Sequence, residues 1–297
     1  MNRFAKLSVT MLLLAFSAQA VAQSDDNEEL KIAALEALIS APPERAMPLA
    51  ARVLEGDHSD EVKERALFIL SQIDHPDAHG MLMSTARNAD GELRDEAIRM
   101  IGISGNADAL ASLSTLYTGG DEDVRDAVLE AYLIAGDEEA VYELAANAQT
   151  DEEFDAAVEI LAAMGASDEL RSLRDRFGMS ESLIEAYIIS HDAESLMEIA
   201  SDNSNLELQA EAIEALGIVG GDEVDAALVD IYRSAATEDI REAALDGMLI
   251  AGHDEGVLEL YRSSNDDAEK KELLEYLVIM GSEEVWDLID AALEEGP

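Results

Sequence analysis

Apolar residues recur at a nearly constant spacing along most of the chain. Residues 124–145 and 240–261 share one template: an apolar anchor, a small or apolar residue four positions later, another apolar residue eight later and a glycine twelve later. A second stretch of periodic apolar residues follows each glycine. The chain is therefore organised by an internal repeat of about thirty residues, whose successive anchors are Leu30, Val62, Leu93, Val124, Phe154, Met179, Leu208, Ile240 and, degenerately, Glu269.

Each repeat predicts two helices. The anchor and the residues four and eight positions later share one helical face, which must be buried, and frequent alanine at the middle position permits close helix packing. Thr150 and Glu153 have capping-box spacing ahead of the Phe154 helix. A two-helix unit cannot enclose a core alone, so the pattern predicts an all-α solenoid of about nine stacked repeats. Glycine twelve residues after the anchor predicts a left-handed end of the first helix at Gly105, Gly136, Gly220, Gly252 and Gly281.

These residues resemble a known repeat family. In residues 123–137 an acid precedes the anchor, a basic residue follows it, and a small residue, a Gly-Asp turn and a second apolar helix come next. This order is similar to short HEAT repeats, and most similar to the HEAT-like repeats first associated with phycobilisome lyases. The resemblance covers residues 30–295. It implies a right-handed superhelix whose second helices line a concave face that usually grips another protein, and it carries over no catalytic residue.

Composition narrows the possible functions. The chain holds 66 Asp+Glu against 19 Lys+Arg, a formal net charge of −47, so nucleic acids and anionic membranes, which need a positive surface, are excluded as expected partners. The lack of cysteine excludes disulfides, thiolate catalysis and Cys-ligated metals. No nucleophile-elbow, zinc-protease, P-loop or dinucleotide motif occurs, so we expect no enzyme and no cofactor. The acidity is open to two interpretations, adaptation to a saline environment and recognition.

The first 22 residues have the three parts of a cleavable export signal. Arg3 and Lys6 form a basic start, residues 7–16 are mostly apolar, and small residues precede expected cleavage after Ala22, with Ala20 as the second choice. No later segment resembles a membrane span. We therefore expect a periplasmic or secreted protein with a signal peptide at 1–22, an acidic segment at 23–29 and one repeat solenoid at 30–297.

One repeat departs from the others. The interval between Phe154 and Met179 is 25 residues, the shortest of the series, and Asp155 and Ser180 replace the basic residue that usually follows the anchor. Its second helix carries three arginines, which predict either a patch for a partner's carboxylate or phosphate, or local ion pairs with Asp168, Glu169, Asp175 and neighbouring repeats. The three arginines are Arg171, Arg174 and Arg176.

Aromatic and histidine side chains supply the other candidate contacts. Tyr232, Tyr261 and Trp286 lie on second helices, where they are candidate partner-binding anchors, although tyrosine at helical spacing is more often half-buried packing. His75 and His79 have the i, i+4 spacing of a metal pair. Pro76 lies between them, so solvated turn residues are the favoured interpretation.

The pattern favours a non-enzymatic scaffold in the cell envelope that binds a protein or peptide on an acidic curved surface. Two alternatives stay open. One is an enzyme or cofactor-binding relative of lyase-type HEAT proteins, and the other is a regulatory or assembly module of an envelope protease or sensor.

Overall fold

The computed structural model describes residues 27–294, and that part of the chain is helical throughout, without strands. The helices pair in sequence into nine successive hairpins, which confirms the predicted all-α repeat architecture. The proposed signal peptide at 1–22 and residues 23–26 of the acidic segment lie outside the described residues, and residues 27–36 form the first helix. No helix in the described range is long and apolar enough to cross a membrane.

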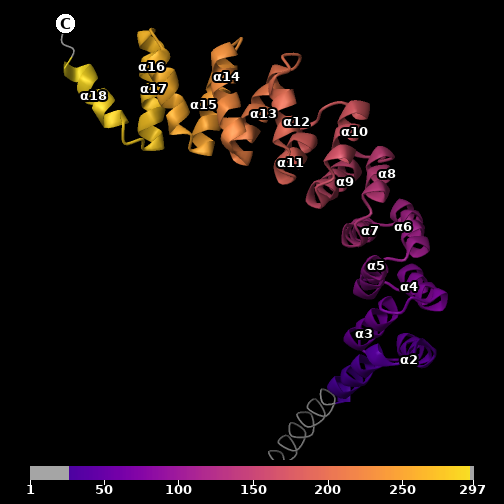
Figure 1. The fold of residues 1–297 in the computed structure, drawn as a ribbon. Coiled ribbons are helices and arrows are strands. Elements are labelled where there is room, and N and C mark those ends of the chain that lie inside the picture. The colour runs from indigo at the N-terminus through magenta and orange to yellow at the C-terminus, as the bar shows by residue number, and fades with distance from the viewer. Residues whose placement is uncertain (1–26, 295–297) are drawn as a thin grey trace, which may run out of the picture. The chain divides into compact units, whose positions relative to one another are not determined.

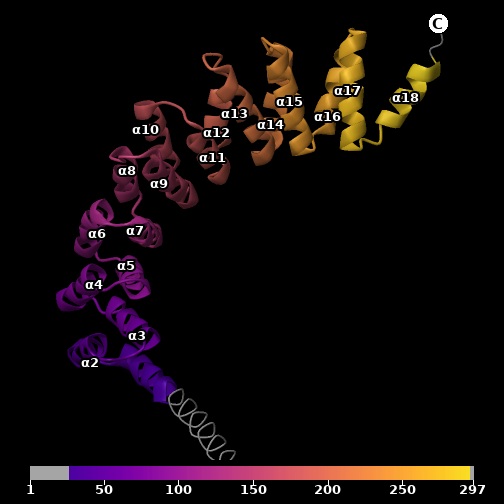
Figure 2. The same ribbon diagram turned by 180° about the vertical axis from the view of Figure 1, so that it is seen from behind.

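The chain divides into two compact units, which meet between Ala140 and Val141. In the first unit, α3, α5 and α7 form one layer and α2, α4 and α6 form the other, as seen from both sides (Figures 1 and 2). Residues 27–36 precede these helices, and the rest of this unit comprises η1 (Ala37–Ser40), α2 (Pro43–Glu55), α3 (Asp60–Ser71), α4 (Pro76–Asn88), α5 (Glu92–Ser104), α6 (Ala107–Gly119) and α7 (Glu122–Ala135). The assignment of residues 30–297 to a single array stays a prediction.

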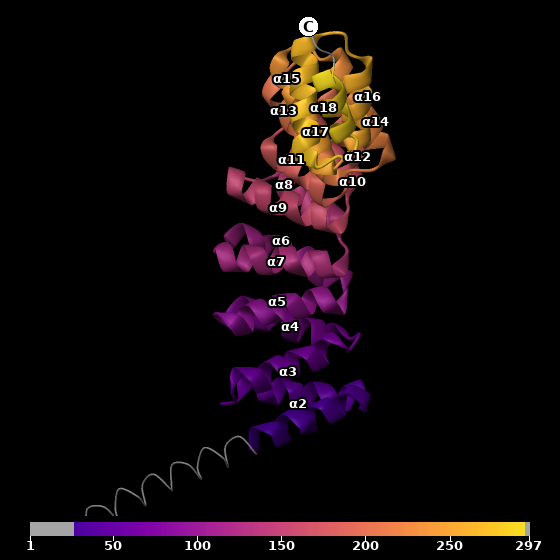
Figure 3. The same ribbon diagram turned by 90° about the vertical axis from the view of Figure 1, so that its left-hand side faces the viewer.

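The second unit repeats the same two-layer arrangement. Its first helices α11, α13 and α15 lie in one layer and its second helices α12, α14 and α16 in the other (Figure 3). After α8 (Glu138–Ala146), which runs across the division, the elements are α9 (Asp151–Met164), α10 (Ser167–Phe177), α11 (Glu181–Ile189), α12 (Ala193–Ala200), α13 (Leu206–Val219), α14 (Asp222–Ser234), α15 (Glu238–Ala251), α16 (Asp254–Ser263), α17 (Asp267–Met280) and α18 (Val285–Glu294).

The apolar template forms the core between the layers. The residues four and eight positions after the anchor are buried in every repeat except the first, where Ala34 is exposed and Leu35 is buried instead. The anchor itself is buried only at Val62, Val124 and Ile240, so its prediction as a core position is wrong elsewhere. Side chains lean towards the N-terminus of their helix, and an anchor in the first turn therefore overhangs the end of the packed layer.

The helix ends follow the predicted glycines with one difference. Gly105, Gly136, Gly252 and Gly281 are left-handed C-caps, as expected. Gly220 also ends its helix at a positive φ of 65°, but its ψ of −173° is extended, because a second glycine follows it and the chain turns over both residues.

Candidate binding cleft

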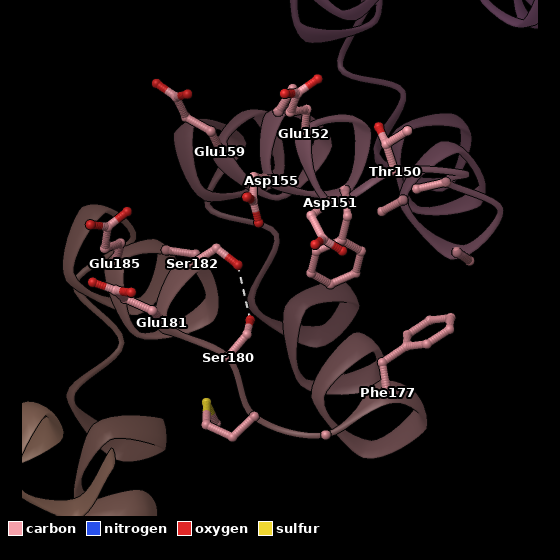
Figure 4. Close-up of a pocket in the computed structure, with 18 of the residues that line it drawn as sticks. Thr150, Asp151, Glu152, Asp155, Glu159, Phe177, Ser180, Glu181, Ser182 and Glu185 are labelled. Atoms are coloured by element: carbon pink, nitrogen blue, oxygen red, sulfur yellow. Dashed lines mark hydrogen bonds between the residues drawn. The ribbon is translucent and has the colours of Figure 1, made fainter. Parts of the chain in front are cut away.

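A large cleft lies in the short repeat, within the second unit. It has a volume of about 1160 Å³ and opens between the first helices α9 and α11 (Figure 4). The end of α8 and the loop between α10 and α11 complete its wall. The shortest interval of the repeat pattern thus coincides with this opening between two first helices.

The cleft exists because α11 is short. It has 9 residues, whereas its neighbours in the layer, α9 and α13, have 14 each. Five fewer residues correspond to about 7.5 Å of helix axis at 1.5 Å per residue. The start of α9 therefore has no full-length helix beside it, and its first turns face the opening.

A glycine determines the conformation of the loop that replaces the missing turns of α11. Gly178 ends α10 with φ 92° and ψ 177°, a conformation that L-residues rarely adopt. Two residues later, Ser180 caps α11, and its hydroxyl lies 2.9 Å from that of Ser182 at the mouth of the cleft (Figure 4). The chain consequently crosses the edge of the cleft in extended form before α11 begins.

Two phenylalanines are the aromatic residues of the cleft lining, which also contains smaller apolar side chains such as Met179 and Ile189. The rings of Phe154 and Phe177 meet edge to face, with centroids 6.0 Å apart and an interplanar angle of 71°. Phe177 is 52% exposed although it is a large apolar side chain. The guanidinium carbon of Arg176 lies 5.0 Å from its ring centroid, so one face of this ring already accepts a cation.

All the charged residues of the lining are acidic. Asp155 points from α9 towards α11, whereas Glu152 and Glu159 point away along the rim (Figure 4). No lysine, arginine or histidine lines the cleft. Within residues 27–294, none of its carboxylates makes a hydrogen bond or an ion pair. Such a group of exposed like charges creates a negative potential that attracts cations, and its members are Asp151, Glu152, Asp155, Glu159, Glu181 and Glu185.

Arg171 is bound to the next second helix. Its Nη2 lies 2.9 Å and 3.0 Å from the two carboxylate oxygens of Asp192, and its Nε donates to Ser195 Oγ at 3.0 Å. The Asp192 side chain is only 4% exposed. Burial alone would raise the pKa of Asp192, but hydrogen bonds from Ser195 and the charge and hydrogen bonds of Arg171 outweigh it and lower the pKa. This pair is a structural brace between α10 and the start of α12.

The other two arginines of α10 differ from each other. Arg174 pairs with Glu198 of α12 at 2.8 Å and with Asp175 at 3.2 Å. Arg176 is exposed, lies over Phe177, and has no ion pair within the described residues. The geometry of Arg171 and Arg174 favours the alternative of local ion pairs, and a partner-binding role for the three arginines stays a prediction.

The aromatic candidates occupy three different environments. Tyr232 is buried, and its hydroxyl donates to Glu269 Oε1 at 3.1 Å, while burial and this carboxylate raise its pKa. Tyr261 is half-buried, with Lys270 Nζ 5.6 Å from its ring centroid. Trp286 is 64% exposed on α18. Trp286 alone of the three presents most of its surface to a partner, and the structure brings none of them to the cleft.

The two candidate metal-ligating histidines have separate roles. His75 caps α4, and its Nδ1 accepts a hydrogen bond from the Asp77 backbone N–H at 3.1 Å. His79 is buried within the same helix, so its interpretation as a solvated turn residue is wrong. Among residues 27–294, no group of three or more histidine, aspartate or glutamate side chains is arranged to hold a metal ion. The contacts of His75 agree with its interpretation as a turn residue.

The cleft residues carry only a weak signal in the sequence. Asp155 and Ser180, which replace the repeated basic residue, both line the cleft. The remaining carboxylates escape prediction because 66 acids occur along the chain, so that no acidic cluster stands out. The 25-residue interval and the loss of the repeated basic residue are the sequence features that point to this place.

Comparison with known proteins identifies the repeat. Residues 47–133 match a family model described as HEAT repeats, which confirms the resemblance on that segment. No curated protein matches the chain in sequence. The match shows HEAT repeats over residues 47–133, and the nine helical hairpins of the described residues have an all-α solenoid architecture.

Several solved structures resemble the chain at low sequence identity. The complex of CpcE and CpcF of phycocyanin lyase from Nostoc sp. PCC7120 is 19% identical, with 79% of this chain and 94% of that chain covered and a TM-score of 0.35. Human deoxyhypusine hydroxylase in complex with glycerol is 16% identical, with 80% and 99% covered and a TM-score of 0.32. An engineered protein is 20% identical, with 80% and 97% covered and a TM-score of 0.21. Superpositions at these scores carry no argument about function.

Proposed function

We propose that this protein is a non-enzymatic binding scaffold of the cell envelope, periplasmic or secreted, whose cleft between α9 and α11 receives a basic segment of a protein or peptide partner. The observation that carries the proposal is the cleft itself, about 1160 Å³ in volume, with six carboxylates, no cation and two phenylalanines in its lining. The envelope location rests on the signal-like pattern of residues 1–22.

The chemistry of the lining fits lysine and arginine side chains. These side chains bury their aliphatic stems on apolar surface and keep the charged end near polar groups. Phe154 and Phe177 offer apolar surface, and Asp155 of α9 and Glu181 of α11 supply negative charge to the lining from the two facing helices. Arg176 over Phe177 shows within the protein itself how a guanidinium packs on this ring.

Replacing three cleft carboxylates tests the proposal. The variant Asp151→Asn/Glu152→Gln/Asp155→Asn removes three negative charges from the start of α9. Exposed ion pairs contribute about 0.2–1 kcal/mol each, so we expect about tenfold weaker binding of a fluorescein-labelled peptide of alternating lysine and leucine. Fluorescence anisotropy measures the affinity, and raising the salt concentration should narrow the difference because salt screens exposed charges.

A matched variant on α15 provides the control. Glu238→Gln/Asp239→Asn/Glu242→Gln removes the same number of charges from the same helical positions as the cleft variant, at the start of another first helix outside the cleft. Its affinity for the lysine–leucine peptide should stay close to that of the unmodified protein. If both variants bound the peptide equally weakly, its affinity would depend on the overall charge of the protein, and the cleft would be rejected as the binding site. A glutamine–leucine peptide that bound as tightly as the lysine–leucine peptide would reject the basic partner.

A further inference from the structure

A second pocket, of opposite character, lies at the N-terminal end of the first unit. It has a volume of about 310 Å³ and is enclosed by residues 27–40, α2 and the start of α3. Its wall is mostly aliphatic, with Leu35 and Val62 buried and Leu49 38% exposed. Leu38 and Val53 complete this apolar surface.

The charged residues of this pocket are all basic. Lys31 and Arg52 line it together with His58, and no aspartate or glutamate does. Within residues 27–294, neither Lys31 nor Arg52 makes an ion pair, although the chain holds 66 acids for 19 Lys+Arg. Arg65, which does not line the pocket, pairs with Glu36 at 3.5 Å. Two cations beside one apolar pocket are therefore without an ion-pair partner in the part of the chain that the structure describes.

His58 adds hydrogen-bonding capacity that the protein does not use. Its Nδ1 is buried and has no hydrogen-bond partner in the described part of the chain. The ring packs on Gly56, where a Cβ would come within 2.8 Å of it, so the absence of a side chain at this position leaves room for the ring. Apolar walls with a few convergent polar groups are the usual composition of a small-molecule site.

The size of the pocket limits its occupant. A volume of 310 Å³ equals about ten water molecules at roughly 30 Å³ each, which is the small end of the range of about 300–1,000 Å³ for ligand sites. An aliphatic chain suits the leucine and valine wall, and a carboxylate suits two unpaired cations. A cationic or uncharged head group would leave both cations without a partner.

We propose that this pocket binds a free aliphatic carboxylate of about eight carbons, with its chain along Leu35, Leu38 and Leu49 and its carboxylate towards Lys31 and Arg52. The site is independent of the cleft between α9 and α11, because it lies in the other unit and selects the opposite charge.

Titration calorimetry of the full chain with a series of straight-chain carboxylates tests this proposal. From butanoate to hexanoate to octanoate, affinity should rise about two- to fourfold per methylene, because each one buries further apolar area, and it should level off at decanoate, which exceeds the pocket. Octanol and octylammonium should bind at least about tenfold more weakly than octanoate, since neither offers an anion to the two cations. Absence of octanoate binding, or equal binding of octylammonium, would overturn the proposal.

Two variants and a matched control locate the site. Lys31→Gln/Arg52→Gln should weaken octanoate binding about tenfold or more. The control Lys63→Gln/Arg87→Gln changes the lysine at the same repeat position and the arginine in the last turn of the next second helix, and should bind as the unmodified protein does. Ala34→Phe, at an exposed position in the pocket wall, should abolish binding by filling the space while the melting temperature stays within a few degrees. Unchanged binding in the first and third variants would place octanoate elsewhere and reject the pocket.

Discussion

Two junctions between first helices in the second unit are built from the same repeat, but one is closely packed and the other is open. Between α13 and α15 the helices approach so closely that a Cβ on Gly217 would lie 2.3 Å from the carbonyl oxygen of Gly247. Between α9 and α11 there is a cleft of about 1160 Å³. The first pair consists of two helices of 14 residues, whereas the second joins helices of 14 and 9 residues.

The difference shows where a binding cleft can form in this fold. A closed junction needs full-length neighbours and a small residue at the crossing. The open junction has a truncated helix, and the second helices beside it are bridged by long side chains, from Arg171 to Asp192 and from Arg174 to Glu198. Shortening one helix therefore creates a cleft without interrupting the array, because charged side chains of the other layer span the gap.

The largest expected effect on the free energy of unfolding comes from replacing Arg171, which pairs with the buried carboxylate of Asp192. Arg171→Leu leaves Asp192, whose side chain is 4% exposed, without its cation. Removing one partner of a buried pair costs about 3–5 kcal/mol, and we expect about 2 kcal/mol because Arg171 is 31% exposed and Ser195 still donates to Asp192 through its N–H and hydroxyl. Urea unfolding followed by circular dichroism measures the loss.

Arg176→Leu is the matched control for this substitution. Arg176 lies on the same helix and has no ion pair among the described residues. Its replacement should change the free energy of unfolding by less than about 0.5 kcal/mol, as at other surface positions. Equal losses in the two variants would show that Arg171 contributes through its helix alone and would contradict the brace.

An alanine at the closed junction should have the next largest effect. Gly217→Ala introduces the residue that α9 already carries at the equivalent place, Ala162, three positions before the C-cap glycine. Helix propensity alone favours alanine by about 1 kcal/mol. The added Cβ would meet the Gly247 backbone, which cannot rotate away, so overpacking of about 1–3 kcal/mol should prevail and lower the stability.

The sign of this change decides between the two contributions. A decrease in the free energy of unfolding, measured with urea, confirms that close backbone contact holds α13 against α15. A gain of about 1 kcal/mol, the value of helix propensity alone, would show that the helices can separate at no cost. In that case helix length, and not the glycine contact, would distinguish the closed junction from the open one.

Much of the fold could be predicted because the buried face repeats. The positions four and eight residues after the anchor are buried in all repeats but the first. Thr150 accepts a hydrogen bond from the Glu153 backbone N–H at 3.2 Å, as capping-box spacing predicts. The Glu153 carboxylate accepts from the Gln149 N–H at 2.8 Å, one residue before the expected partner. Local spacing thus describes the helices well and their exact ends less well.

The cleft could not be predicted because it depends on contacts between repeats. The 25-residue interval marks the place, and the arginines within it suggested either a patch or ion pairs. Their main partners, Asp192 and Glu198, follow 21 and 24 residues later on another helix. Repeat spacing alone does not specify which carboxylates of the next helix lie within reach, and it does not show that the missing turns belong to α11.

The smallest expected effect on stability comes from the acidic side chains beside the open junction between α9 and α11. Glu211 on α13 is crowded by Glu181 of the cleft and by Glu207 and Glu214, and burial first and these charges second raise its pKa above 4.5. Because the pKa of Glu211 is raised in the folded state, protonation of this side chain stabilises the fold. This contribution of Glu211 to stability is fully present below pH 4.5 and is lost as the pH rises through the folded-state pKa.

Glu211→Gln imitates the protonated form at every pH. It should therefore stabilise the protein by about 0.5 kcal/mol at neutral pH, the scale of like-charge repulsion on helices. In thermal melts, the gain should disappear below pH 4.5. A gain independent of pH would show that shape, and not charge, limits packing next to the cleft.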